Sequence, residues 1–202
     1  MARATWMGSK YALDRPDVEF ALAVLGRGGL VVYPTETLYG LGTHAASAEA
    51  VSRLTEVKKR PPGQGISVAV SGLSQIEVWA RVEPAARDFI GSNLPGPYTV
   101  ILPARDAAPR HLVTETGIAF RIPRHPVPAL LTKLFGPITA TSANVHGGDP
   151  PVDVETARAQ LGEAVDVYID AGPCELGLAS TVVDFTAGRP KVIRPGAVPK
   201  GG

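Results

Sequence analysis

The sequence has only one cysteine, Cys174, among its 202 residues. One cysteine cannot form an internal disulfide or complete a cysteine-rich zinc site, so the composition favours a reducing compartment. The amino terminus lacks a charged segment followed by a long apolar one, and no apolar run approaches the roughly 18 residues of a membrane span. We therefore expect a cytoplasmic protein that has no membrane partner.

Aromatic residues and net charge are also scarce. Phe, Trp and Tyr make up 6% of the chain, which argues against an aromatic platform for single-stranded RNA. Twenty Lys and Arg against nineteen Asp and Glu leave a formal charge of +1, so overall charge does not indicate a nucleic-acid partner. The histidines show no metal-ligand spacing, and we expect no metal held by protein side chains.

Apolar residues, 45% of the chain, occur at both helical and strand spacing. Helices are predicted from Pro16, after the cap Ser47, at a capping box formed by Ser74 and Glu77, and over residues 130–134. Predicted strands cover 30–33, 66–70, 98–102, 118–121 and 138–141, and 181–185 with 191–194 predict a β-hairpin. This mixture predicts an α/β fold. We expect a single domain over 1–202, with a core of 12–200, on one twisted, mixed parallel and antiparallel sheet flanked by helices.

Two polar segments, 58–61 and 141–144, each flank a predicted strand. Lys58 is a mobile point charge and Arg60 a planar bidentate donor, which together suit a polyphosphate. Ser142 and Asn144 gather a hydroxyl, an amide and backbone N–H groups in one loop. Taken alone, the first segment is more often a solvated helix end, and the second is more often a turn. Together they indicate two halves of an anion site that binds ATP without a P-loop.

The segment 35–42 contains glycine but matches neither the P-loop nor the dinucleotide fingerprint. Leu38 and Tyr39 suit either the wall of a small-ligand site or a structural connection. Glu36 is a conceivable general base, although a hydrogen bond that orders the loop fits it better. Arg121 ends an apolar strand and is either a carboxylate clamp or half of a structural ion pair.

Seven short segments carry a resemblance to the threonylcarbamoyl-AMP synthases, the YrdC-like family, in its short single-domain type. They follow the family order over almost the whole chain and are 33–42, 58–61, 95–102, 120–123, 140–144, 180–184 and 193–196. One departure lies after the Lys-x-Arg-Pro turn, where Gly65, Ile66 and Ala69 replace residues that the family commonly has. The exact threonine contacts on this strand therefore stay open.

The resemblance implies specific roles for individual residues. The hallmark catalytic positions are Lys58, Arg60, Ser142 and Asn144. The implied threonine-binding residues are Thr35, Ser67, Arg121, Thr141 and Ser180. The implied ATP-binding residues are Lys58, Arg60, Ser142, Ala143, Asn144 and Arg194.

The reaction that the resemblance implies joins L-threonine, bicarbonate or CO2, and ATP into threonylcarbamoyl-AMP and pyrophosphate, with Mg²⁺ on the phosphates. This activity is a nucleotidyl transfer. The product would pass to a transferase that modifies adenosine 37 of tRNA. Two other functions remain open: a module that binds double-stranded RNA or tRNA, and a relative that uses carbamoyl phosphate. Either residues 61–65 or the tail after Arg194 would serve as a lid.

Overall fold

The structure is a computed structural model that describes residues 5–7 and 15–198. Its helices are α1 Arg15–Gly26, α2 Ala48–Val57, α3 Leu73–Trp79, α4 Pro84–Asn93, α5 Pro126–Leu134 and α6 Val154–Leu161. Its strands are β1 Thr5–Met7, β2 Val31–Tyr33, β3 Gly40–Gly42, β4 Val68–Ala69, β5 Tyr98–Leu102, β6 Ile118–Arg121, β7 Ile138–Thr139, β8 Thr141–Ser142, β9 Val167–Asp170, β10 Thr181–Asp184 and β11 Lys191–Arg194. Short 3-10 turns cover Arg110–Leu112 and Gly162–Ala164.

The described strands form two sheets. One has the order β1-β9-β2-β3-β8, and the other has the order β11-β10-β5-β6-β4-β7. Each sheet combines parallel pairs, such as β2 with β9 and β5 with β10, with antiparallel pairs, such as β2 with β3 and β5 with β6. The predicted α/β class with mixed strand directions is confirmed, and so is the carboxy-terminal hairpin of β10 and β11.

The sequence predicted one sheet, and the division into two arises at Ala140. The predicted strand 138–141 is split there, because β7 pairs with β4 in the second sheet whereas β8 pairs with β3 in the first. The backbone N–H of Ala140 donates to the carbonyl of Ser67 at 2.7 Å, which anchors the crossing. A strand that changes sheets forms a corner, and this corner brings the two sheets together.

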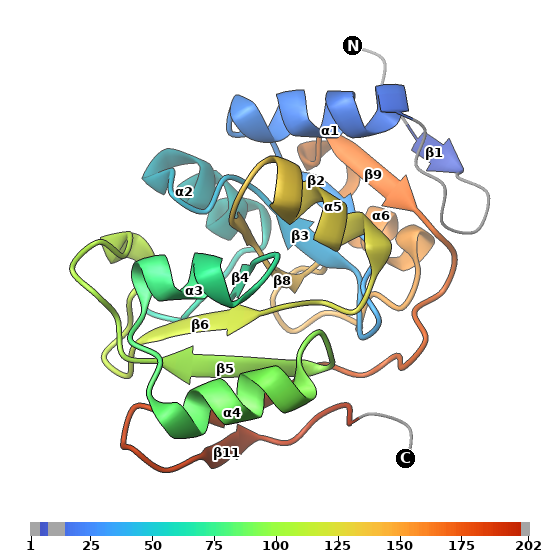
Figure 1. Cartoon of the computed structure of the whole chain (residues 1–202). Helices are drawn as coiled ribbons and strands as arrows, with labels where there is room; N and C mark the ends of the chain where they lie inside the picture. The colour runs from blue at the N-terminus through green and yellow to red at the C-terminus, as the bar shows by residue number, and fades with distance from the viewer. Residues whose placement is uncertain (1–4, 8–14, 199–202) are drawn as a thin grey trace.

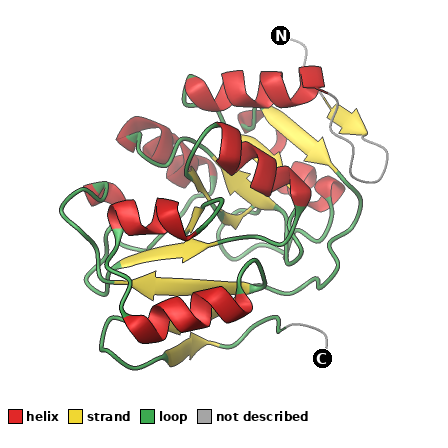
Figure 2. Ribbon diagram, viewed as in Figure 1, coloured by secondary structure: helices red, strands yellow, loops and turns green. Residues whose placement is uncertain are grey.

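Helices cover both sheets (Figures 1 and 2). Helices α1 and α5 lie near each other, and Ala21, Val24 and Leu131 share a buried cluster with residues of β2 and β9. Helix α4 lies beside β5, where Phe89 contacts Tyr98 edge-on with ring centroids 5.3 Å apart. Aliphatic side chains dominate the larger core cluster between these layers. The apolar faces that hold the layers together also fix the strand ends around the site.

Two predicted helix starts have different outcomes. Ser47 caps α2 as predicted, since its Oγ accepts from the backbone N–H of Ala50 at 3.2 Å. The predicted capping box at Ser74 is wrong, because α3 begins after Gly72 and already contains Ser74. Instead, Gln75 Oε1 accepts from the backbone N–H of Ser71 at 2.8 Å. Among the helices of residues 5–7 and 15–198, none has the length and hydropathy needed to cross a membrane.

Candidate active site

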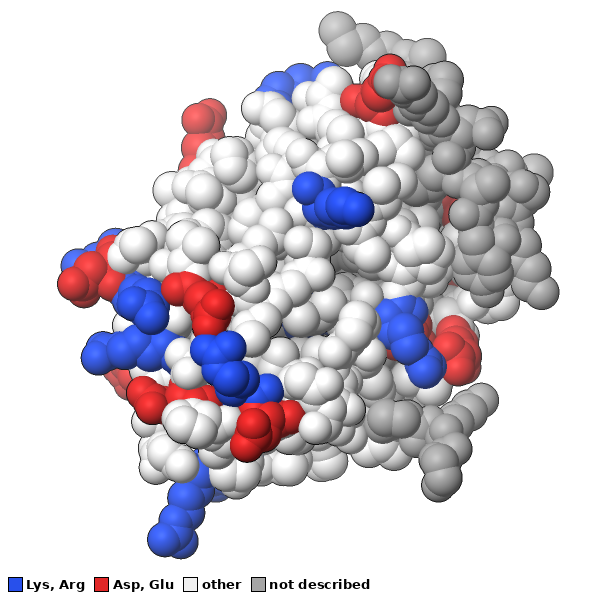
Figure 3. Space-filling model, viewed as in Figure 1, with Lys and Arg blue, Asp and Glu red and all other residues white. Residues whose placement is uncertain are grey.

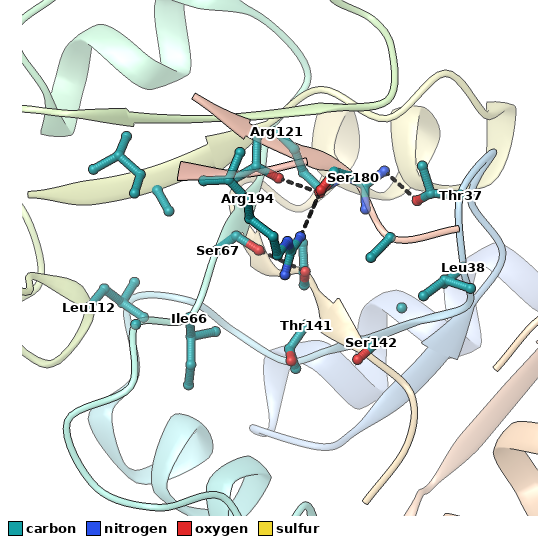
Figure 4. Close-up of a pocket in the computed structure, with 18 of the residues that line it drawn as sticks. Thr37, Leu38, Ile66, Ser67, Leu112, Arg121, Thr141, Ser142, Ser180 and Arg194 are labelled. Carbon is teal, nitrogen blue, oxygen red and sulfur yellow. Dashed lines mark hydrogen bonds between the residues drawn. The ribbon is translucent and has the colours of Figure 1, made fainter. Parts of the chain in front are cut away.

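A cavity of about 420 Å³ lies where the two sheets meet, and both sheets supply its walls (Figure 4). Its charged lining residues within the described ranges are Arg60, Arg121 and Arg194, with no carboxylate among them. The lining residues with hydroxyl groups are Tyr33, Thr35, Thr37, Tyr39, Ser67, Thr99, Thr114, Thr116, Thr141, Ser142 and Ser180. Such a wall of guanidinium and hydroxyl donors suits a ligand that carries several negative charges.

Arg121 lies at the end of β6, where it lines the cavity and forms a buried ion pair. Its Nη2 donates to Glu36 Oε1 at 3.1 Å and to Thr37 Oγ1 at 2.9 Å. Only 8% of the Arg121 side chain and 1% of the Glu36 side chain are exposed. The sequence left a carboxylate clamp and a structural ion pair as alternatives, and the structure shows the ion pair at a residue that also lines the cavity.

Glu36 itself does not line the cavity. Its Oε2 accepts from the backbone N–H of Arg124 at 3.1 Å, which ties the loop after β2 to the chain after β6. The hydrogen bond that orders the loop, favoured from the sequence, is therefore present.

Arg60 follows the end of α2, and its side chain lines the cavity. Its Nη2 donates to the carbonyl of Gly65 at 2.6 Å, and its Nη1 lies 3.5 Å from Thr141 Oγ1. Its Nε is buried without a partner among the described residues. Burial, and then the nearby charge of Arg194, lower the pKa of Arg60. The guanidinium therefore has a donor and a charge that an anionic ligand would stabilise.

Lys58 is buried behind the cavity wall. Its Nζ donates to the carbonyls of Ser142 and Asn144, at 2.5 Å in each case. Burial, with a smaller contribution from Arg60, lowers its pKa to about 8. The two polar segments that the sequence linked do meet, although the lysine holds the backbone of the second segment and does not point into the cavity.

The 142–144 loop is ordered by its own side chains. Ser142 Oγ donates to Asn144 Oδ1 at 2.5 Å, and Asn144 Nδ2 donates to the carbonyl of Gly148 at 3.0 Å. The backbone N–H of Ala143 donates to the carbonyl of Tyr39 at 2.8 Å. Of these three loop residues, only Ser142 lines the cavity.

The terminal hairpin closes another side of the cavity. Arg194 Nη2 donates to the Ser180 carbonyl at 2.8 Å and lies 3.3 Å from its Oγ. Ser180 Oγ also shares a 2.8 Å hydrogen bond with Thr99 Oγ1 on β5 (Figure 4). Burial, and then the charge of Arg121, lower the pKa of Arg194. Arg194 therefore interacts electrostatically with both Arg60 and Arg121.

All five residues implied for threonine line the cavity, whereas Arg60, Ser142 and Arg194 are the only ones of the six implied for ATP that do. Each residue of the threonine set already has a protein partner, and the partners of Thr35 and Ser67 are backbone carbonyls. Thr35 Oγ1 donates to the carbonyl of Leu38 at 2.6 Å, and Ser67 Oγ donates to the carbonyl of Ala140 at 2.8 Å.

The hydroxyl groups of Thr99, Thr114 and Thr116 also belong to the lining and were not predicted from the sequence. For Thr99, the alternation of residues between the two faces of β5 could have predicted a position on the cavity side. The turn that carries the other two gives no comparable pattern.

The described residues offer neither a cluster of metal ligands nor an activated thiol. The described residues contain no cluster of three His, Cys, Asp or Glu side chains suited to a metal ion. Burial raises the pKa of Cys174 to about 11, which keeps the thiol protonated and unreactive at neutral pH.

Residues 23–196 match the Sua5/YciO/YrdC family, whose description reads "Telomere recombination". The chain belongs to this family. It is 41% identical over 160 residues to the threonylcarbamoyl-AMP synthase of Xanthomonas campestris, with 77% of this chain and 83% of that one covered.

Solved structures of this family share the fold. Sua5 of Pyrococcus abyssi, solved as a complex with L-threonine, is 33% identical with a TM-score of 0.87 over 93% of this chain. The alignment covers only 56% of the Pyrococcus abyssi chain. YciO of E. coli is 30% identical with a TM-score of 0.82, and the alignment covers 91% of this chain and 90% of that one.

Proposed function

We propose that this protein is a threonylcarbamoyl-AMP synthase. The observation that carries the proposal is the cavity, where three arginines and many hydroxyl groups, but no carboxylate, are found among the described lining residues. Support comes from the family membership, from relatives that bear this name, and from a relative that has been solved with L-threonine. The substrates are L-threonine, bicarbonate or CO2, and ATP.

The proposed chemistry has two bond-forming steps. The threonine nitrogen attacks the carbon of CO2 or bicarbonate and loses a proton, with water as the second product from bicarbonate, to give an N-carboxylate. An oxygen of this carboxylate then attacks the α-phosphorus of ATP, and the bond from that phosphorus to the bridging oxygen breaks as pyrophosphate leaves. Both steps join separate molecules, so positioning and charge stabilisation supply the catalysis.

Each cavity arginine has a proposed task. Arg121 binds the threonine carboxylate, while Arg60 and Arg194 neutralise the polyphosphate. Ser142 adds a polar hydroxyl oxygen to the lining, and Lys58 keeps the 142–144 loop in place through its two carbonyl contacts. Thr35, Ser67, Thr141 and Ser180 shape the threonine side.

Magnesium belongs to the substrate in this proposal. Mg²⁺ prefers oxygen ligands and keeps several waters, and phosphates supply such oxygens. The described cavity lining offers hydroxyl groups and no carboxylate, so we propose that Mg²⁺ enters already bound to ATP. The tRNA-modifying transferase that would take the product, and the cytoplasmic location, stay predictions.

The test measures pyrophosphate from ATP with Mg²⁺ and bicarbonate, in the presence of L-threonine, L-serine or no amino acid. Threonine-dependent pyrophosphate, together with the mass of threonylcarbamoyl-AMP, is the expected result. Arg121→Ala should abolish most of the turnover. Arg124→Ala is the matched control, because the side chain of Arg124 pairs with the exposed Glu175 outside the cavity lining.

Two results would replace the proposal with another function. Turnover of carbamoyl phosphate that needs no threonine would identify a carbamoyl-phosphate enzyme. Binding of double-stranded RNA that weakens steeply with salt, without ATP turnover, would identify an RNA-binding module. On the face shown in Figure 3, basic and acidic side chains of the described residues interleave and form no continuous basic surface.

A further inference from the structure

Glu36 is a buried carboxylate behind the cavity wall, and each of its oxygens binds a different partner. Oε1 accepts from Arg121 Nη2, and Oε2 accepts from the backbone N–H of Arg124. The Glu36 carbonyl accepts from the backbone N–H of Leu176 at 2.9 Å. Glu36 therefore joins three segments that surround the cavity: the loop after β2, the chain after β6 and the segment before β10.

The side-chain hydrogen bonds of Arg121 to described residues all run through one nitrogen, Nη2. A guanidinium group has five N–H donors, two of them on Nη2. Both Nη2 donors have acceptors, one on Glu36 and one on Thr37 (Figure 4 shows the latter contact). Nε is buried without a partner among the described residues. One end of the planar group is thus fixed, while other donors stay available to a ligand.

We propose that Glu36 is a positioning residue, which acts through Arg121 on the binding of the amino-acid carboxylate. Glu36 holds Nη2 and thereby fixes the plane of the guanidinium, so that the remaining donors meet the substrate carboxylate in a set orientation. A donor group that is already oriented loses less conformational freedom when the ligand binds. The inference rests on the proposed function, because it assigns the ligand of Arg121.

The negative charge of Glu36 is needed as well as its shape. A buried guanidinium without a counter-charge is strongly disfavoured, and Arg194 acts on Arg121 with the same sign of charge. A glutamine has nearly the same shape but only one acceptor oxygen. It can accept from Arg121 or from the N–H of Arg124 but not from both, so its amide NH₂ would face one of these donors.

The experiment compares steady-state kinetics of the wild type and Glu36→Gln, with L-threonine and ATP varied separately. The KM for L-threonine should rise about tenfold or more, as expected for losing a hydrogen bond to a charged group, while kcat and the KM for ATP change less than about twofold. Glu175→Gln is the matched control, since it breaks the neighbouring exposed pair with Arg124 and leaves Arg121 untouched. Its KM for L-threonine should equal that of the wild type.

A second pair of variants separates positioning from general damage to the fold. In an Arg121→Ala background, Glu36→Gln should have no further effect on kcat/KM for L-threonine, because the residue through which it acts is gone. If Glu36→Gln does not fold, Glu36→Asp keeps the negative charge on a side chain that is one methylene shorter. The KM of this variant for L-threonine should rise by a smaller factor. Circular dichroism establishes that each variant is folded.

The possible outcomes are distinct. An unchanged KM for L-threonine in folded Glu36→Gln or Glu36→Asp, or a loss that persists fully in the Arg121→Ala background, overturns the inference and leaves the proposed function standing. A wild-type protein without threonine-dependent turnover refutes the proposed function and this inference together.

Discussion

Replacing Lys58 with methionine tests whether a buried ammonium group holds the 142–144 loop. Only 2% of Lys58 is exposed, and its Nζ binds the carbonyls of Ser142 and Asn144. Methionine fills a similar volume and donates no hydrogen bond. The variant therefore removes the partner of two carbonyl groups and the buried charge at the same time.

Losing the partner of the two carbonyls destabilises the folded state, whereas losing the buried charge stabilises it. Each buried carbonyl without a partner costs about 1–3 kcal/mol, so the two cost about 2–6 kcal/mol. Burial lowers the pKa of Lys58 from its ordinary 10.5 to about 8, which corresponds to a penalty of about 3 kcal/mol on the charged form at pH 7. Removing the lysine relieves this penalty. Near pH 7, the effect of Lys58→Met should therefore lie between a gain of about 1 kcal/mol and a loss of about 3 kcal/mol in stability.

The pH dependence has a definite sign. Between pH 8 and 10.5 the unfolded chain still binds the proton that the folded chain has released, so folding stability rises with pH there. The contribution of Lys58 is thus fully present above its unfolded pKa and is lost as the pH falls through about 8.

Urea unfolding at pH 7 and pH 10, followed by circular dichroism, measures this contribution. The stability of the wild type minus that of Lys58→Met should rise by about 2–3 kcal/mol from pH 7 to pH 10. Groups that titrate in both proteins cancel in the difference. A difference that falls with pH, or no difference at either pH, would show that Lys58 is not the buried clamp described here.

Other variants test the ion pair, the cavity charge and the packing. Arg121→Ala leaves Glu36 buried and unpaired and should cost about 3–5 kcal/mol, and adding Glu36→Gln should recover part of this in urea unfolding; a double variant less stable than the single one would contradict the pairing. Arg194→Ala should raise the KM for ATP more than the KM for threonine, and the reverse ranking would reassign this arginine. Gly42→Ala places a Cβ 2.7 Å from a buried tyrosine ring and should cost about 1–3 kcal/mol by urea unfolding. Gly91→Ala in α4 is the matched control, meets nothing within 4 Å, and should stabilise by about 0.5–1 kcal/mol; equal effects at both glycines would contradict the packing.

The parts of the fold that the sequence predicts are those that local physics decides. Ser47 caps α2 because an N-cap needs only its own side chain and the next turn. The terminal hairpin follows from two β-branched runs around a turn with Gly188 at φ 76°. The polar segments at Lys58 and Ser142 were expected to form one site, and the contacts of Lys58 Nζ with the carbonyls of Ser142 and Asn144 join them.

The structural features that the sequence did not predict depend on contacts between residues far apart in the chain. The chain passes from one sheet to the other at Ala140, because β7 pairs with β4 and β8 pairs with β3. Neither pairing can be predicted from residues 138–141 alone. Strand β9 was not predicted, although it lies between β1 and β2 in the first sheet. The direction of the Lys58 side chain also depends on distant residues, because its acceptors are carbonyls that lie 84 and 86 residues further along the chain.

The contacts of the cavity arginines indicate how such a charged site stays stable without its ligand. Arg60 donates to the carbonyl of Gly65, and Arg194 donates to the carbonyl of Ser180, so each has a neutral protein acceptor. Neutral carbonyls bind a guanidinium more weakly than phosphates do. Binding of a polyphosphate therefore exchanges weak hydrogen bonds for strong ones. It also supplies a counter-charge to two guanidinium groups whose pKa values are lowered by burial first and by a neighbouring arginine second. Because Arg121 already has a carboxylate partner in Glu36, the strongest gain falls on the two arginines that we assign to ATP.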